Sequence, residues 1–224
     1  MEAALRGLLA LILATSSATL AFARGADSDE PPKPTEAVLV LAMDVPISSG
    51  GFRLRRVDLS VPAFAKDGVS FEYDGLFASG SRKALRASDR SPVYFLVRTI
   101  PTGTYVATYQ HFNDTNVVSH IKTWRCTSEQ AAVIEVIAGK VNVVRSNDIF
   151  PPDILGRLNS NISNAIVLSS LEAVAVEHPN LAGVPALLFP TATVNWRTKS
   201  RHSSLEGCEN GEQLRILRKV PPPK

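Results

Sequence analysis

Short apolar stretches alternate with turn-forming residues along most of the chain after residue 36. Such stretches, rich in Val, Ile, Phe, Tyr and Thr and bounded by Gly, Pro, Asn, Asp and Ser, are typical of β-strands. The predicted strands are Ala37–Val45, Phe52–Val61, Val69–Tyr73, Val93–Ile100, Gly103–Gln110, Ile121–Cys126, Ala131–Ala138, Val141–Arg145, Ala186–Phe189, Thr191–Arg197 and Leu214–Lys219.

Details of this pattern predict more than strand positions. Ala37–Val45 is almost continuously apolar, which predicts a strand covered on both faces. Within Phe52–Val61 the apolar positions shift from even to odd residue numbers, which predicts a β-bulge. Gly139 and Lys140 separate two apolar runs, and this tight-turn signal predicts a β-hairpin.

The spacing of apolar residues changes after the two prolines at 151 and 152. Asp153 is a good N-cap, and apolar residues then recur at intervals of four from Ile154 to Ile166, which predicts a helix. A second helical piece is predicted from Ser170 to His178, with Ser170 as its cap and Pro179 as its stop.

Many short strands with a late helical insertion predict a mainly β fold, an antiparallel β-sandwich with one or two short helices. A single β-rich domain is predicted over residues 36–220, followed by a frayed tail at 221–224. The larger aromatic residues are expected to pack in the core or at its rim rather than to form a ligand platform. These residues are Phe95, Tyr105, Trp124 and Trp196.

The first 23 residues have the pattern of a secretory signal peptide. Arg6 precedes an apolar run that extends to Leu20, and Ala21–Ala23 forms an A-x-A cleavage site. We expect cleavage near Ala23 and a periplasmic or secreted mature protein; the alternative is an uncleaved N-terminal anchor. Residues 24–35 are polar and rich in proline, which predicts a flexible linker.

The composition excludes several classes of protein. Hydrophobic residues make up 45% and charged residues 20% of the chain, which are values typical of a globular domain. A formal net charge of +3 on 224 residues does not indicate nucleic-acid binding. After residue 23 no apolar run approaches the roughly 20 residues that a transmembrane helix needs.

The chain has two cysteines, Cys126 and Cys208. An even pair in an exported chain predicts a disulfide, and the alternative is two separate buried thiols. The bridge would close a loop of 82 residues. In the chain-entropy model a loop of that length contributes at most roughly 4–5 kcal/mol to stability.

Two short motifs carry a family resemblance. They are Ile100-Pro101-Thr102-Gly103-Thr104-Tyr105 and Val136-Ile137-Ala138-Gly139-Lys140-Val141, with a weaker third in His178-Pro179-Asn180-Leu181. In these motifs the chain resembles small bacterial envelope β-sandwich domains of uncharacterised function, many of them lipoproteins. The family has a P-x-G-x-Y strand entry and a strand that ends in an A-G-K or A-G-E turn.

The resemblance covers residues 92–145, with a weaker echo to residue 181. It implies a fold and a compartment but no chemistry, because a fold does not determine a function. The chain differs from the family in having no lipobox Cys near the cleavage site and in its extra C-terminal segment with Cys208.

The sequence contains no catalytic motif of defined spacing, neither G-x-S-x-G nor H-E-x-x-H nor a phosphate-binding loop. His111, Asp114 and His120 have metal-ligating side chains, but their spacing fits no known ligand pattern. A solvated loop is therefore the prediction for this segment. We expect no catalytic, cofactor-binding or metal-binding residues.

Two groups of basic residues form the candidate contact surface. Arg53 and Arg55 alternate with apolar residues, so in a strand they project from the face opposite to the core. Arg82, Lys83 and Arg86 lie in a segment with little core pattern. Such a surface suits an anionic polymer, a lipid headgroup or an acidic partner. The alternative is an ordinary solvated sheet face and a mobile loop, because acidic residues lie nearby in the sequence.

These features predict an exported, non-catalytic envelope accessory or binding domain that acts by surface contact. We expect an envelope protein as partner, no nucleic acid, and a monomer or weak oligomer. One alternative is a periplasmic hydrolase or metal-binding protein, because such sites are assembled in space. Another is a structural component of an envelope assembly, with residues 24–35 adding to a strand of a partner.

Overall fold

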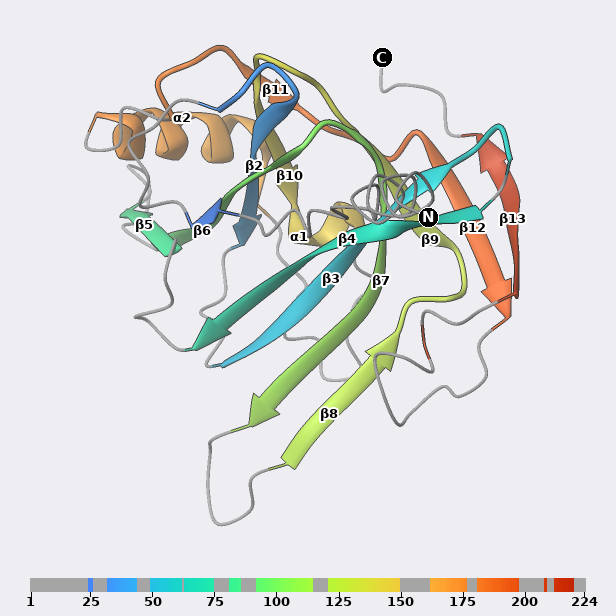
Figure 1. The fold of residues 1–224 in the computed structure, drawn as a ribbon. Helices are drawn as coiled ribbons and strands as arrows, with labels where there is room; N and C mark the ends of the chain where they lie inside the picture. Colours follow the sequence, from blue (N-terminus) through green and yellow to red (C-terminus); the bar gives the residue numbers. More distant parts are fainter. Residues whose placement is uncertain are drawn as a thin grey trace, which may run out of the picture.

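The computed structural model describes residues 24–25, 32–43, 49–61, 63–74, 81–85, 92–114, 121–149, 162–176, 181–197, 208 and 212–219. These residues form two stacked β-sheets, and a helix covers the outer face of one sheet (Figure 1). The predicted β-sandwich with short helices is therefore confirmed. The predicted signal peptide and the tail at 221–224 lie outside the described residues.

The first sheet, sheet A, is built around β2 (Glu36–Met43). β2 pairs with β6 (Pro92–Pro101) on one side and with β10 (Val141–Arg145) on the other, and β11 (Pro185–Leu187) lies beyond β10. β1 (Arg24–Gly25) and β5 (Ser81–Leu85) both pair with β6. β10 runs parallel to β2 and β11, whereas the other pairs in the sheet are antiparallel.

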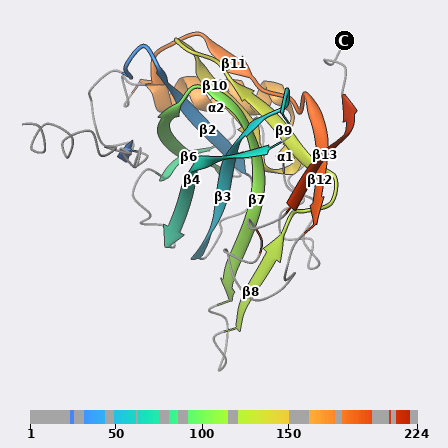
Figure 2. The same ribbon diagram turned by 45° about the vertical axis from the view of Figure 1, so that its right-hand side comes forward.

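The second sheet, sheet B, has its strands in the order β13 (Glu212–Lys219), β12 (Ala192–Arg197), β9 (Ala131–Val136), β7 (Gly103–Asp114), β3 (Ser49–Asp58) and β4 (Ala63–Asp74). β8 (Ile121–Cys126) also pairs with β7. The end strands β4 and β13 contact each other. Sheet B is therefore curled, with β7 and β9 between its two ends (Figure 2).

The core has separate apolar clusters on the faces of the sheets. Leu39, Leu41, Phe71, Ile100 and Ile134 belong to the cluster between sheets A and B. The alternate residues of β2 face a second cluster between sheet A and the helix. The prediction that this strand is covered on both faces is confirmed. The curl of sheet B encloses a third cluster on its other face.

The structure contains a short helix α1 (Ser146–Ile149) and a longer helix α2 (Asn164–Ala175). The predicted cap at Ser170 is wrong, because Ser170 lies inside α2 and is buried. The N-cap is Ser163, whose hydroxyl accepts a hydrogen bond from the backbone N–H of Ile166 (3.3 Å). The helix does not break at residue 170 because Val167, Leu171 and Val174 form one continuous buried face.

The predicted β-hairpin at Gly139 and Lys140 is also wrong. β9 belongs to sheet B and β10 to sheet A, so the turn carries the chain from one sheet to the other. The buried amide of Asn142 holds this crossing: it donates to the carbonyls of Ile137 and Lys140 (2.9 and 3.1 Å) and accepts from the N–H of Ile137 (2.9 Å). These local bonds replace the ladder that a hairpin would form.

A β-bulge was predicted within Phe52–Val61, where the apolar positions shift from even to odd residue numbers, and the structure has an irregularity there. The register between β3 and β4 shifts between Arg55 and Val57, where β4 contributes the extra residues. Before the shift Phe52 and Leu54 face sheet A, and after it Val57 faces the third cluster. The strand thus buries opposite faces in its two halves.

Residues 24–35, predicted to be a linker, contribute β1, whose Arg24 and Gly25 pair with Thr99 and Arg98 of β6. Pro32–Thr35 leads into β2, and the N–H of Glu36 donates to the carbonyl of Lys33 (2.8 Å). Among the described residues no helix is long and apolar enough to cross a membrane.

Candidate functional site

Arg53 and Arg55, here called the arginine pair, lie on β3 where the strand alternation places them. Their neighbours Phe52 and Leu54 are buried between the two sheets. Arg53 and Arg55 are half-buried on the opposite face of sheet B. Tyr109 of β7 lies on the same face, since it is the register partner of Arg53. The predicted projection of the two arginines away from the inter-sheet core is confirmed.

Neighbouring β4 holds both side chains against the sheet. Arg53 Nη1 donates to Ser70 Oγ (3.3 Å), and Arg55 Nη2 donates to the carbonyl of Ala65 (2.5 Å). Gly68 lies between them: a Cβ at this position would be 2.8 Å from Arg55 Cδ and 3.3 Å from Arg53 Nε. Because Gly68 has no side chain, the side chains of Arg53 and Arg55 can both pack over this position.

Arg55 also contacts Phe64, one of two aromatic residues that span the opening of the curled sheet. Its guanidinium carbon lies 5.7 Å from the ring centroid of Phe64 on β4. Phe64 in turn meets Trp196 of β12 edge to face, with ring centroids 5.3 Å apart and an interplanar angle of 88°. We call Phe64 and Trp196 the aromatic bridge, because it joins strands near the two ends of sheet B.

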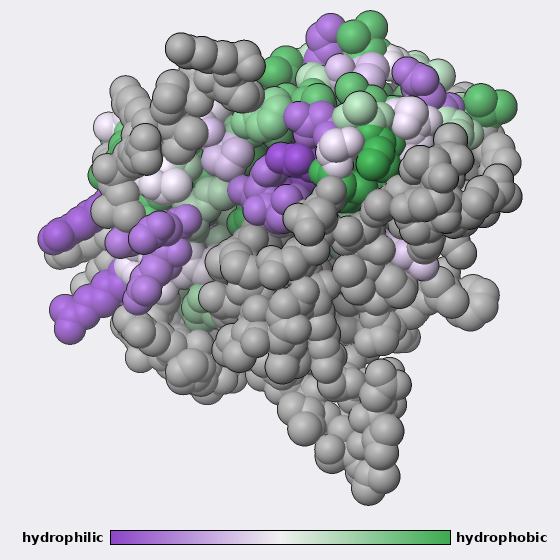
Figure 3. All heavy atoms as spheres, turned by 180° about the vertical axis from the view of Figure 1, so that it is seen from behind, coloured by the Kyte–Doolittle hydropathy of each residue, from purple (hydrophilic) through white to green (hydrophobic). Residues whose placement is uncertain are grey.

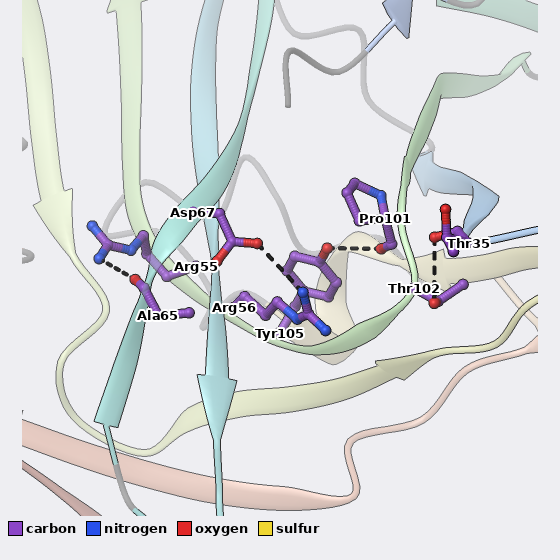
Figure 4. Close-up of polar contacts among 8 residues, drawn as sticks. All are labelled: Thr35, Arg55, Arg56, Ala65, Asp67, Pro101, Thr102 and Tyr105. Carbon is purple, nitrogen blue, oxygen red and sulfur yellow. Dashed lines mark hydrogen bonds and ion pairs between the residues drawn. The ribbon is translucent and has the colours of Figure 1, made fainter. Parts of the chain in front are cut away.

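Arg56 lies on the other side of β3, together with Tyr105, while Arg55 points away from both (Figure 4). Arg56 Nη1 is 3.6 Å from Asp67 Oδ2, and both side chains are 45% exposed. An exposed pair at this distance contributes little to stability. The three arginines of β3, Arg53, Arg55 and Arg56, therefore place positive charge on both faces of the sheet.

Tyr105 anchors the crossing between β6 and β7. Its hydroxyl donates to the carbonyl of Pro101 (2.7 Å), a device also found at the corners of other β-sandwiches. Burial raises the pKa of Tyr105 to about 12, which the charge of Arg56 opposes and that of Asp67 reinforces. Nearby, the backbone N–H of Thr102 donates to the carbonyl of Thr35 (2.9 Å). The hydroxyl of Thr102 donates to the same carbonyl (3.4 Å; Figure 4). The P-x-G-x-Y motif thus has a structural role, because its tyrosine fixes the crossing between β6 and β7.

The second group of basic residues does not join the first. Arg82 and Lys83 lie in β5 of sheet A, whereas the arginine pair lies in sheet B. Arg86 lies outside the described residues. The two groups that the sequence suggested as one contact surface therefore belong to different sheets.

Cys126 and Cys208 form the predicted disulfide, with their Cα atoms 5.5 Å apart. This separation lies within the usual range for a disulfide. The bond joins the end of β8 to the segment between β12 and β13. A disulfide is typical of a protein that folds in an oxidising compartment.

The described residues contain no group of three or more His, Cys, Asp or Glu side chains placed to hold a metal ion. The loop predicted for this segment is wrong at His111 and Asp114, which lie in β7 and pair with β8, and His120 lies outside the described residues. The aromatic residues Phe95, Tyr105 and Trp196 are buried, as predicted for core packing.

An apolar groove of about 270 Å³, which the sequence did not suggest, lies between α2 and the chain that enters β11. Leu168, Ala175, Leu181 and Pro185 are among its lining residues, and Glu172 supplies its charge. This lining suits an apolar side chain. On the face opposite to that of Figure 1, hydrophobic residues gather mainly in the upper part and are mixed with hydrophilic ones (Figure 3).

Comparison with known protein families, with curated proteins and with solved structures finds no match for this chain. The resemblance to envelope β-sandwich domains therefore stays a prediction. The arginine pair remains the candidate site because of its geometry on β3.

Proposed function

We propose that this chain is an exported, non-catalytic binding domain whose arginine pair contacts phosphate or carboxylate groups of a partner in the cell envelope. The observation that carries the proposal is the arrangement of Arg53 and Arg55 on one face of β3, with their stems ordered by Gly68 and β4. Guanidinium groups bind phosphate and carboxylate through paired hydrogen bonds, and a pre-ordered side chain loses less entropy on binding.

Export is part of the proposal and is supported by two features. The first is the signal-peptide pattern that ends at Ala23. The second is the Cys126–Cys208 disulfide, since such bonds persist in oxidising compartments. N-terminal sequencing of the protein recovered from its own cell envelope tests this part, and an N-terminus at Arg24 is expected.

The binding test uses polyphosphate and poly-glutamate as probes, which separate phosphate from carboxylate recognition. The variant Arg53→Gln/Arg55→Gln is expected to weaken binding of the preferred probe by about tenfold, equivalent to roughly 1.4 kcal/mol. Raising the salt concentration should weaken binding to the unmodified protein, because screening reduces exposed charge–charge attraction.

Lys33→Gln/Lys140→Gln is the matched control, because it removes the same charge from two exposed turn residues outside the β3–β4 face. If this control weakens binding as much as the arginine variant, the effect comes from net charge and the site is wrong. Crosslinking in the native envelope, followed by mass spectrometry, identifies the partner; the expected result is a dominant protein attached near β3 or β4.

A further inference from the structure

We propose that the Cys126–Cys208 disulfide holds the arginine pair in its binding geometry through the aromatic bridge, so that the redox state of this bond sets the affinity of the site for anions. The inference rests on the proposed function and adds regulation to it. A continuous series of contacts between the disulfide and Arg55 carries it.

The series begins at Cys208, which is fully buried. Its carbonyl accepts a hydrogen bond from the indole Nε1–H of Trp196 (2.9 Å). The same residue is covalently attached to Cys126 at the end of β8. The position of Cys208 is therefore fixed by the disulfide, and Cys208 in turn orients the ring of Trp196.

The series continues across the opening of sheet B. Trp196 contacts the ring of Phe64 edge to face, and the face of Phe64 lies beneath the guanidinium of Arg55. Edge-to-face ring pairs and cation–π contacts both depend on ring orientation. A change in the orientation of Trp196 is therefore transmitted to Phe64 and from there to Arg55.

The place of the aromatic bridge makes it sensitive to the disulfide. β4 and β13 stand at opposite ends of the strand order, so in the described part of sheet B side-chain contacts rather than a hydrogen-bonded ladder close the curl. Phe64 and Trp196 supply such a contact. Side-chain contacts between the two ends of the sheet separate more readily than a hydrogen-bonded ladder once the disulfide is cleaved.

The redox step is a thiol–disulfide exchange with a dithiol reductant. Cys126 is partly exposed, which lets a thiolate attack its sulfur and form a mixed disulfide. The second thiol of the reductant then resolves this bond. The reductant leaves as a disulfide, and Cys126 and Cys208 gain two electrons and two protons in total to become thiols.

The test measures binding of polyphosphate and poly-glutamate to the oxidised protein and to the reduced, alkylated protein. Reduction is expected to weaken binding by about fivefold, a size typical of coupling between sites. Equal affinity of the two forms would overturn this inference and leave the proposed function standing. Binding of neither probe to either form would instead overturn the proposed function.

A second variant keeps the test decisive if the reduced protein unfolds. Phe64→Leu breaks the aromatic bridge while the disulfide stays intact, and it is expected to lower affinity to the level of the reduced protein. Ile216→Val is the control, because Ile216 packs against the same cluster without belonging to the series. An affinity of Phe64→Leu equal to that of Ile216→Val contradicts the inference.

Discussion

Single residues at the β6–β7 crossing show how local chemistry joins the two sheets. Tyr105 ties the start of β7 to Pro101 at the end of β6 through its buried hydroxyl. Gly103, between them, has a φ of +148°, a backbone conformation that residues other than glycine rarely adopt. Arg56 packs against Gly103, where a Cβ would lie 2.8 Å from Arg56 Nε.

Replacing Tyr105 with Phe is expected to lower the free energy of unfolding by about 1–2 kcal/mol, because it leaves the Pro101 carbonyl without this donor. The pKa of the Tyr105 hydroxyl is about 12 in the folded protein, whereas that of an unfolded tyrosine is about 10. The contribution of the Tyr105 hydroxyl to the free energy of unfolding is therefore complete below pH 10, and it falls as the pH rises from 10 to 12. Urea unfolding of both proteins across this range should show the difference in their pH dependence.

Gly103→Ala is expected to cost about 2–3 kcal/mol, from backbone strain together with the contact with Arg56. Gly139→Ala is the matched control, because Gly139 has a φ of +66° but no atom within 4 Å of the added Cβ. The control should cost only about 1 kcal/mol. Adding Arg56→Ala should recover the steric part of the Gly103→Ala loss; no recovery would show that strain alone sets the cost.

At the level of elements, the crossing between β9 and β10 depends on Asn142. Its fully buried amide joins the turn at Ile137 and Lys140 and also donates to the carbonyl of Val38 on β2 (3.3 Å). This side chain therefore connects the turn to the centre of sheet A.

Asn142→Ala is expected to destabilise the protein by about 2–4 kcal/mol, because backbone groups of Val38, Ile137 and Lys140 lose their partner at once. Asn147→Ala, at an exposed position in α1, is the control and should change stability by less than about 0.5 kcal/mol. Thermal unfolding of the two variants compares them directly. Similar melting temperatures would mean that the turn is held by other contacts.

Elements with strong periodicity could be predicted from the sequence, and weak ones could not. β8 has the predicted bounds, Ile121–Cys126, and β2 shows the expected burial of both faces. β5 was missed because Ser81–Leu85 has little alternation and forms a strand by pairing with β6. The turn at Gly139 was misread because the same residues suit a hairpin and a crossing between sheets.

The candidate site was predictable only in part, for a similar reason. The shared face of Arg53 and Arg55 follows from strand alternation within β3. The contact of Phe64 with Trp196 depends on the curl of sheet B, which brings distant segments of the chain together. Local sequence patterns carry no information about such a contact.

At the level of the whole molecule, the disulfide links the end of β8 to the segment between β12 and β13, 82 residues further along the chain. Removing it with Cys126→Ser/Cys208→Ser is expected to lower the free energy of unfolding by at most about 4–5 kcal/mol, mainly through greater freedom of the unfolded chain. Urea denaturation of oxidised protein and variant measures the difference. An unchanged midpoint would mean that the contacts around Trp196 and Cys208 suffice without the covalent bond.

The position of β2 in the chain has a consequence for how the protein reaches its native state. β2 is apolar on both faces, yet its partners β6 and β10 are synthesised much later, and Val38 pairs with Val141 of β10. Non-local pairing of this kind makes folding slow. Until β10 is available, β2 lacks the partner strand on one side and keeps its apolar side chains uncovered, and such a segment is prone to aggregation. The native pairing of β2 can therefore be completed only after β10 has been made.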